Sequence, residues 1–246
     1  MHPELIAHRG YALRYPENTV LAVEAALVAG ACHVEIDVQL SADQLPMVFH
    51  DRDLARMTGR TGAIHDYPAA DLRELRASEV ARFGARYMDV HLATLAEIVA
   101  LFRHWPGATL FVEIKRVALE RFGIDAVYRA VERELVPIRD RAPLISFDFD
   151  VLLTARWCGW PRLGVVLERW AERDHPFVRE IAPEFVFCDQ RDLPRGGQLR
   201  FGRARGVAYE VDDPARARAL AARGIALIET FAIKEMLAAL QDGTDG

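Results

Sequence analysis

Cysteine is scarce in this chain, and its placement argues against two kinds of stabilised protein. The 246 residues include Cys32, Cys158 and Cys188 as the only cysteines, and no Cys-x-x-Cys pair occurs. An odd number of cysteines at long intervals does not suit a disulfide framework or a thiolate zinc site. We expect buried, free thiols in a reducing compartment.

Long hydrophobic runs are absent as well. The apolar run at residues 25–32 is far shorter than the ~18 residues that a membrane span needs. Residues 1–8 show no basic start followed by a long apolar core, which is the pattern of a secretory signal. We therefore expect a cytoplasmic protein without a stable membrane anchor.

Positive charge is not in excess. The chain has 31 Lys and Arg against 36 Asp and Glu, for a net charge of −5. Proteins that bind nucleic acid usually have a basic excess or patch, so we expect no nucleic-acid partner. No glycine-rich phosphate-binding motif follows a strand-like run, which removes the commonest nucleotide-binding signature of open sheets. The sequence leaves the oligomeric state open.

What is present is an ordinary globular composition, 51% hydrophobic and 27% charged. Short apolar runs typical of strands alternate with helical stretches. The strand-like runs lie at residues 5–8, 33–38, 47–50, 109–115, 144–147, 163–167, 185–188, 207–211 and 226–229, and the helical stretches at 17–29, 94–104, 124–136, 149–158, 214–223 and 232–240. About eight alternations in ~250 residues favour a (β/α)₈ barrel, although a doubly wound open sheet alternates in the same way.

Ionisable side chains recur near the ends of four strand-like runs. The period-2 rule places Glu35 and Asp37 on one strand face, and Glu113 and Lys115 on another. An exposed polar face would explain either pattern alone, but the repeat on a second strand argues against that explanation. Carboxylates inside a parallel barrel are costly unless they are paired or bound to metal. Glu35, Asp37 and Glu113 form an all-oxygen set, which suits Mg²⁺ or Ca²⁺ better than Zn²⁺.

His8 and His50 end two further runs and are the acid–base candidates, because imidazole titrates near neutrality. Arg9 and Lys115 could bind a phosphate or form salt bridges to the nearby carboxylates. Together these groups favour proton-coupled transfer on an anionic phosphoester. The remaining histidines are interpreted as structural: His2, His33, His65, His91, His104 and His175.

Several motifs follow one another in a fixed order. They are His8-Arg9-Gly10, Pro16-Glu17-Asn18-Thr19, Glu35-Ile36-Asp37-Val38, His50-Asp51, Leu54-Ala55-Arg56-Met57-Thr58-Gly59, Thr94-Leu95-Ala96-Glu97, Val112-Glu113-Ile114-Lys115 and Ser146-Phe147. This set resembles the glycerophosphodiester phosphodiesterase family, closely over residues 5–167 and less closely beyond. An ordered set of this kind is far more specific than a lone motif.

The resemblance implies a TIM-like (β/α)₈ barrel. We predict one domain over residues 1–246, with a short excursion after the second-strand region, at about residues 52–93, that caps the barrel. We also expect Thr94 to cap the helix that follows it, with Glu97 completing a capping box. Glu17 and Asn18 are expected to hold the first loop by satisfying free N–H groups at the start of the next helix.

The resemblance also implies an activity, the metal-dependent hydrolysis of a small-molecule glycerophosphodiester to glycerol 3-phosphate and an alcohol. It assigns one divalent cation, Mg²⁺ or Ca²⁺, to Glu35, Asp37 and Glu113. It makes His8 and His50 the acid–base pair, gives Arg9 and Lys115 the phosphate, and places Phe147 and Tyr209 at the substrate. It allows the neighbouring hydroxyl of the substrate's own glycerol to attack the phosphorus.

The last two strands depart from the family pattern. Tyr209-Glu210 stands where the family usually has Trp-Thr, and Glu229-Thr230 where it commonly has Thr-Asp. These changes bear on substrate preference more than on the chemistry. Two alternatives are phospholipase D-like hydrolysis of a lysophospholipid on the same barrel and non-catalytic binding of a phosphate ligand. The presence of every motif residue favours the enzyme.

Overall fold

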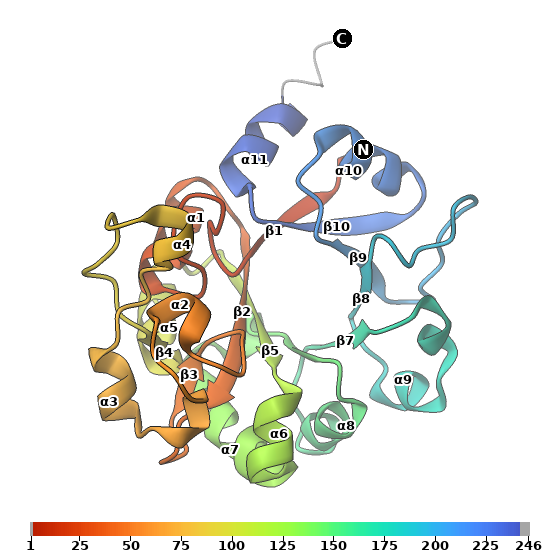
Figure 1. Ribbon diagram of the computed structural model, residues 1–246. Helices are drawn as coiled ribbons and strands as arrows, with labels where there is room; N and C mark the ends of the chain where they lie inside the picture. Colours follow the sequence, from red (N-terminus) through yellow and green to blue (C-terminus); the bar gives the residue numbers. More distant parts are fainter. Residues whose placement is uncertain (1, 242–246) are drawn as a thin grey trace.

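The protein, described from a computed structural model of residues 2–241, is built around a closed barrel of eight parallel strands. Around the barrel the order is β1, β2, β5, β6, β7, β8, β9 and β10, and β1 pairs with both β2 and β10. Figure 1 looks into this ring, with helices outside it. The strands are β1 (Glu4–His8), β2 (His33–Leu40), β5 (Thr109–Ile114), β6 (Leu144–Ser146), β7 (Leu163–Leu167), β8 (Phe185–Asp189), β9 (Arg205–Tyr209) and β10 (Ile225–Thr230). The predicted TIM-like barrel is confirmed.

One strand-like run was misassigned. Residues 47–50 belong to β3 (Pro46–Val48) and the residues after it, and β3 pairs antiparallel with the end of β2 rather than joining the barrel. The two-residue strand β4 (Ala93–Thr94) pairs antiparallel with β3 in turn. This small extension stands on the carboxyl end of β2 and returns the chain toward the mouth of the barrel.

The helices follow from local sequence signals. Thr94 accepts a hydrogen bond from the Glu97 N–H, and the Glu97 carboxylate accepts one from the Thr94 N–H, which confirms the predicted capping box. Asp148 and Asp213 are simple N-caps of two later helices, and the side chain of each accepts a hydrogen bond from a backbone N–H of the first turn. The α-helices outside the segment between β3 and β4 are α1 (Val20–Val28), α5 (Leu95–Phe102), α6 (Arg116–Phe122), α7 (Ile124–Leu135), α8 (Phe149–Trp157), α9 (Pro176–Ile181), α10 (Pro214–Ala222) and α11 (Ile233–Gln241).

Two apolar layers stabilise the barrel, one on each face of its strands. Side chains that point outward pack against the helices and form the larger core. Side chains that point inward fill the barrel with Ile6, Phe111, Ile145, Val166, Phe185, Phe187, Val207 and Leu227. The interior is therefore packed rather than open. Because successive side chains alternate between the faces, the next inward position on each strand lies at the mouth.

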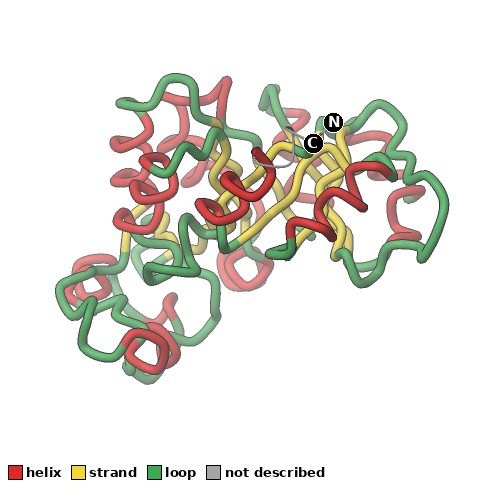
Figure 2. The backbone as a smooth tube through the Cα atoms, turned by 90° about the horizontal axis from the view of Figure 1, so that it is seen from above, coloured by secondary structure: helices red, strands yellow, loops and turns green. Residues whose placement is uncertain are grey.

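The predicted excursion lies between β3 and β4 and includes α2 (Ala55–Thr58), α3 (Ala69–Glu74) and α4 (Val80–Phe83). It has a small apolar cluster of its own, which includes Leu54, Met57 and Leu72. Figure 2 shows it as loops and short helices that stand off one side of the barrel. Its α4 region is tied to the loop after β1, because Arg82 donates to the Ala12 carbonyl at 2.7 Å.

The cysteine prediction is correct only in part. All three thiols are free, but Cys188 alone is buried, whereas Cys32 and Cys158 are exposed. Burial raises the pKa of the Cys188 thiol to about 12. Between residues 2 and 241, none of the helices has the length and apolar character needed to cross a membrane.

Candidate active site

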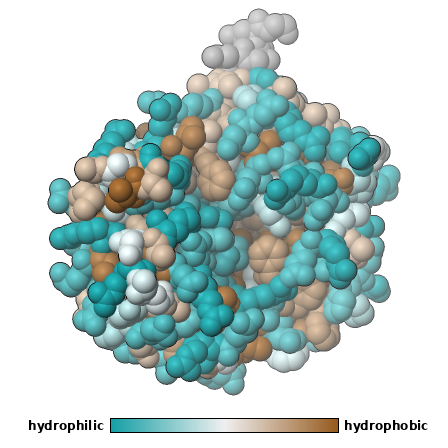
Figure 3. Space-filling view, in the orientation of Figure 1, coloured by the Kyte–Doolittle hydropathy of each residue, from teal (hydrophilic) through white to brown (hydrophobic). Residues whose placement is uncertain are grey.

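The candidate site lies where the strands end, one inward position beyond the apolar filling of the barrel. Inward positions continue from Ile6 to His8, from Phe111 to Glu113, from Ile145 to Phe147, from Val207 to Tyr209 and from Leu227 to Glu229. A cavity of about 160 Å³ opens there. Figure 3 shows a hollow near the middle of this side of the molecule, with hydrophilic residues along one edge and hydrophobic ones along the other. It is lined by His8, Arg9, His50, Glu113, Lys115, Ile145, Phe147, Val166, Phe187, Tyr209, Glu210 and Glu229.

Three carboxylates meet below this cavity. In the strand register His8 pairs with Glu35, and Asp37 pairs with Glu113. Glu35, Asp37 and Glu113 each offer an oxygen within 4.8 Å of the others, and all three residues are buried. Glu35 Oε1 has no hydrogen-bond partner among the described residues. A buried all-carboxylate set with an unsatisfied oxygen fits a hard divalent cation.

Two side chains partly neutralise these carboxylates. Lys115 Nζ lies 2.8 Å from Glu113 Oε1 and 3.1 Å from Asp37 Oδ1, and Arg9 Nε lies 3.2 Å from Asp37 Oδ2. Burial alone would raise the pKa of Asp37, but Lys115 and Arg9 outweigh it and hold that pKa well below its usual range. Both cations therefore form the salt bridges that the sequence allowed, and both also line the cavity.

Without a metal ion, ionisation of the other two carboxyl groups, those of Glu35 and Glu113, is unfavourable. Burial, followed by the charges of Asp37, Glu229 and Glu113, raises the pKa of Glu35 well above its usual value. The pKa of Glu113 is also raised, by burial against the opposing effect of Lys115. A bound divalent cation would offset this cost, because it favours the ionised form of each ligand.

His8 reaches the site directly from β1. Its Nε2 lies 3.6 Å from Glu35 Oε2, and its ring stacks on Phe231 with the centroids 4.7 Å apart. Burial, followed by the positive charge of Arg9, lowers the pKa of His8 well below its usual value. The turn after His8 depends on Gly10, which has φ +79°, and a Cβ at Gly10 would lie 2.6 Å from the backbone of Ala22.

His50 reaches the site by a different route from the one predicted. It does not end a barrel strand. Instead, the antiparallel β3 brings the chain back, and the Phe49 N–H donates to the Asp37 carbonyl at 2.9 Å. This bond sets His50 at the height of the carboxylates. His50 Nδ1 lies 2.8 Å from Asp51 Oδ1, so the neighbouring carboxylate orients the ring.

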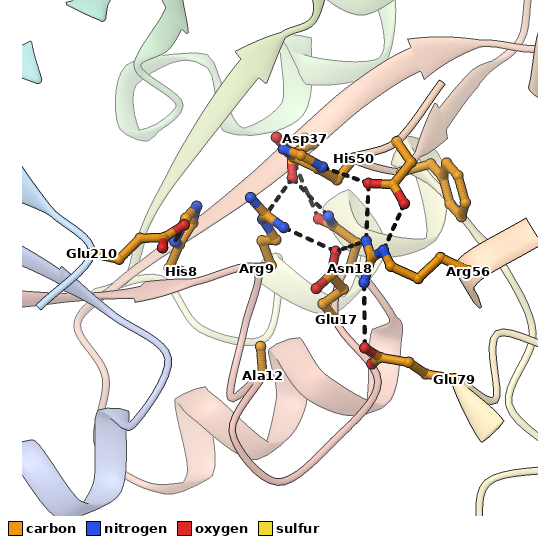
Figure 4. Close-up of polar contacts among 12 residues, drawn as sticks. His8, Arg9, Ala12, Glu17, Asn18, Asp37, His50, Arg56, Glu79 and Glu210 are labelled. Atoms are coloured by element: carbon orange, nitrogen blue, oxygen red, sulfur yellow. Dashed lines mark hydrogen bonds and ion pairs between the residues drawn. The ribbon is translucent and has the colours of Figure 1, made fainter. Parts of the chain in front are cut away.

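A chain of ionic hydrogen bonds links the two halves of the site (Figure 4). Arg56 of the excursion donates to Asp51 from Nε at 2.6 Å and to Glu17 at 2.6 Å. Glu17 also accepts from Arg9 at 3.0 Å. His50 and Arg9 are thus connected through Asp51, Arg56 and Glu17, and the excursion supplies the middle member of the chain.

The expected capping roles of Glu17 and Asn18 were wrong. Thr19 caps α1, because its hydroxyl accepts from the Ala22 N–H. Asn18 instead donates to Asp37 Oδ2 at 2.8 Å and accepts from the Asp37 N–H at 3.1 Å. Asn18 thus holds Asp37 in place, and Glu17 holds Arg9. Both contacts depend on the packing of the loop against the distant strand β2.

Glu210 and Glu229, the two departures from the family pattern that were expected to bear on substrate preference, both line the cavity. Glu229 is buried, and burial together with the charges of Glu113 and Asp37 raises its pKa well above its usual value. The alternation from Leu227 to Glu229 is the signal that could have placed it, once β10 was known to turn Leu227 inward. His33, by contrast, lies at the other end of the barrel, where it bonds to Glu4 at 2.8 Å, as expected for a structural histidine.

Comparison with known proteins now decides the family. The model of the glycerophosphoryl diester phosphodiesterase family matches residues 8–186. The chain belongs to this family. The match stops before β9, so Glu210 and Glu229 lie outside it.

Two relatives illustrate the range of similarity. A glycerophosphodiester phosphodiesterase of Caldanaerobacter subterraneus is 35% identical over 202 residues, covering 74% of this chain and 79% of the relative. Another, of Bacillus altitudinis, is 33% identical over 144 residues, covering 58% of each chain. The alignment thus spans less than two thirds of that relative's own length.

Solved structures show the same fold at low sequence identity. An Oleispira antarctica phosphodiesterase, in complex with the product sn-glycerol-3-phosphate, superimposes with a TM-score of 0.81 at 24% identity, covering 98% of this chain and 97% of that one. A putative glycerophosphoryl diester phosphodiesterase of Silicibacter pomeroyi gives 0.84 at 20% identity, covering 98% and 94%. These likenesses support the barrel architecture.

Proposed function

We propose that the protein hydrolyses glycerophosphodiesters to glycerol 3-phosphate and an alcohol, with the help of one divalent cation, Mg²⁺ or Ca²⁺. The observation behind this proposal is the convergence, at the mouth of one barrel, of the carboxylates of Glu35, Asp37 and Glu113 with His8 and His50. Family membership and the names of the relatives support it. The substrate is a small molecule, in keeping with a cavity of about 160 Å³.

Glu35, Asp37 and Glu113 would hold the cation, which supplies positive charge to the phosphoryl oxygens when it is bound. Arg9 and Lys115 line the same cavity and add fixed positive charge for the phosphate. The ion pairs that Arg9 and Lys115 form with Asp37 and Glu113 hold these two basic side chains in position before the substrate arrives. The electrostatic work of the site is therefore preorganised.

His8 and His50 exchange the protons. They come from different parts of the chain, β1 and the segment after β3, and both line the cavity. One takes a proton from the attacking oxygen, and the other gives a proton to the oxygen of the leaving alcohol. Asp51 keeps the His50 ring in place during this exchange.

The attacking group is the 2-hydroxyl of the substrate's own glycerol. Its oxygen forms a bond to phosphorus while the bond from phosphorus to the leaving alcohol breaks. The cyclic phosphate that results is then opened by water to give glycerol 3-phosphate. An intramolecular attack has the large effective concentration of a positioned nucleophile.

A product assay tests this function. Purified protein with Mg²⁺ or Ca²⁺ is given glycerophosphocholine, glycerophosphoethanolamine, glycerophosphoglycerol or a lysophospholipid, and the products are identified by phosphorus NMR. We expect glycerol 3-phosphate from the diesters and a loss of activity in chelator. His50→Ala should lower kcat by about 10²–10⁴-fold, and the exposed His104→Ala should leave it unchanged.

Two results would contradict the proposal. Turnover of the lysophospholipid alone would favour the phospholipase D-like alternative. Binding of the diesters without turnover of any of them, in either metal, would favour a phosphate-ligand binding protein.

A further inference from the structure

The cavity contains more negative charge than the cation and the phosphodiester require. The three ligand carboxylates, Arg9, Lys115 and a divalent ion together carry one net positive charge, which the single negative charge of a phosphodiester balances. Glu210 also lines the cavity and stands outside this balance. Within residues 2–241 its carboxylate has no Arg or Lys in ion-pair distance, and its one such contact is His8 Nδ1 at 3.8 Å.

Glu229 is a second carboxyl group of the cavity that, in the described part of the chain, is left without a partner for one of its oxygens. It is 3% exposed, and its Oε1 has no hydrogen-bond partner among the residues that the structure describes. Buried polar atoms are nearly always satisfied, so this oxygen calls for a donor that comes with the ligand. We call Glu210 and Glu229 the acidic pair.

Aromatic rings stand on the same cavity wall. Phe147 follows β6 and Tyr209 ends β9, and both line the cavity together with the acidic pair. We call these two rings the aromatic wall. An organic ammonium group is attracted both to carboxylates and to the faces of aromatic rings, and a site that offers both is suited to it.

The location of Glu210 relates this region to one end of the substrate. In the view of Figure 4, Glu210 lies beside His8, on the side away from Arg9 and Asp37. The phosphate is expected to bind near Arg9 and the metal ligands. A substituent of the phosphate that extends past His8 would therefore reach Glu210. On the other side of the mouth, near His50, the acidic side chains of Glu113 and Glu168 are matched in number by the basic side chains of Lys115 and Arg116.

We propose that the acidic pair and the aromatic wall form a subsite for a leaving alcohol that carries an ammonium group. This inference rests on the proposed function and adds a substrate preference to it. The protein then selects glycerophosphodiesters with a cationic headgroup over those with a neutral one. Glu210, which departs from the family pattern, is the main specificity-determining residue.

The test compares two diesters of opposite headgroup character in three forms of the enzyme. The substrates are glycerophosphoethanolamine, whose primary ammonium group can donate hydrogen bonds to the acidic pair, and glycerophosphoglycerol, whose headgroup is neutral. The measured quantity is the ratio of their kcat/KM values. Any effect of Glu210 on His8 acts on both substrates and cancels in this ratio. Glu24→Gln is the matched control, because Glu24 is an exposed glutamate on α1 and is not among the residues that line the cavity.

We expect the wild type to prefer the cationic substrate, and Glu210→Gln to lower the ratio roughly 3- to 10-fold through a higher KM for that substrate. Glu24→Gln should leave the ratio unchanged. An unchanged ratio in Glu210→Gln, or an equal fall in both variants, would overturn the subsite. If the wild type hydrolyses neither diester in the presence of metal, the proposed function itself fails.

Discussion

Replacing Glu35 by Gln should have opposite effects on stability in the absence and in the presence of metal. Glu35 is 1% exposed, and its pKa is raised well above the usual value by burial and by Asp37, Glu229 and Glu113. A carboxyl group whose pKa is higher in the folded state destabilises that state as the pH rises above its unfolded pKa, about 4.3. At neutral pH this penalty is present in the metal-free protein, and Gln removes it.

Gln also preserves the local geometry. The Arg9 N–H donates to Glu35 Oε2 at 3.1 Å, and the amide oxygen of Gln can accept the same bond. Each kcal/mol regained raises Tm by about 2–4 °C in a chain of this size, so the metal-free variant should melt a few degrees higher than the wild type. Metal at 100 times its Kd should stabilise the wild type by about 2.7 kcal/mol, or roughly 5–11 °C, and the variant much less.

Thermal melts in chelator and in excess Mg²⁺ or Ca²⁺, at pH 5 and pH 7.5, measure both effects. The advantage of the variant in chelator should be larger at pH 7.5 than at pH 5, because the penalty grows as the pH rises. Glu24→Gln, on the exposed face of α1, is the control and should match the wild type throughout. A lower Tm for Glu35→Gln in chelator would show that Glu35 is structural, and an undiminished metal shift would show that it is not a ligand.

Three further predictions concern catalysis. Arg56→Gln removes the partner shared by Asp51 and Glu17, so kcat should fall about 10-fold and the free energy of unfolding by about 1–3 kcal/mol, and Arg56→Lys should recover only part of either loss. Steady-state kinetics and urea unfolding measure the two effects, and an unchanged kcat would refute this link. His8→Ala should lower kcat by about 10²–10⁴-fold with little change in KM, and near-normal turnover would remove its acid–base role. A diester whose glycerol lacks the 2-hydroxyl should inhibit competitively but react at least about 10²-fold more slowly, and equal turnover would indicate direct attack by water.

The alternation of strands and helices and the carboxylate cluster were predictable because both depend on periodicity, whereas the choice of a closed barrel over a doubly wound open sheet depended on the family resemblance. Alternation along β2 puts Glu35 and Asp37 on one face, and the parallel pairing of β2 with β5 then brings Glu113 beside Asp37. Neither step needs knowledge of side-chain packing. The same rule extends the inward face from Leu227 to Glu229, but it could be applied there only after the orientation of β10 was known.

The route of His50 and the roles of Glu17 and Asn18 were not predictable from local patterns. Residues 47–50 have the composition of a barrel strand, and only the tight turn before them, in which the Gln44 N–H donates to the Ser41 carbonyl, reverses their direction. The partners of Glu17 and Asn18 come from distant parts of the chain. Local capping rules favour a nearby N–H, whereas the folded structure supplies Asp37 and Arg56 instead.

Formation of sn-glycerol 3-phosphate from a glycerophosphodiester, measured for the wild type and for Glu113→Gln in the same divalent-metal buffer, tests the central claim most directly. We predict rapid release by the wild type, loss of that release in excess chelator, and a kcat at least about 10²-fold lower for the variant, because the removed ligand belongs to the cluster that holds the cation. Full activity of Glu113→Gln, or of the wild type after complete removal of metal, would contradict the proposed role of the three carboxylates.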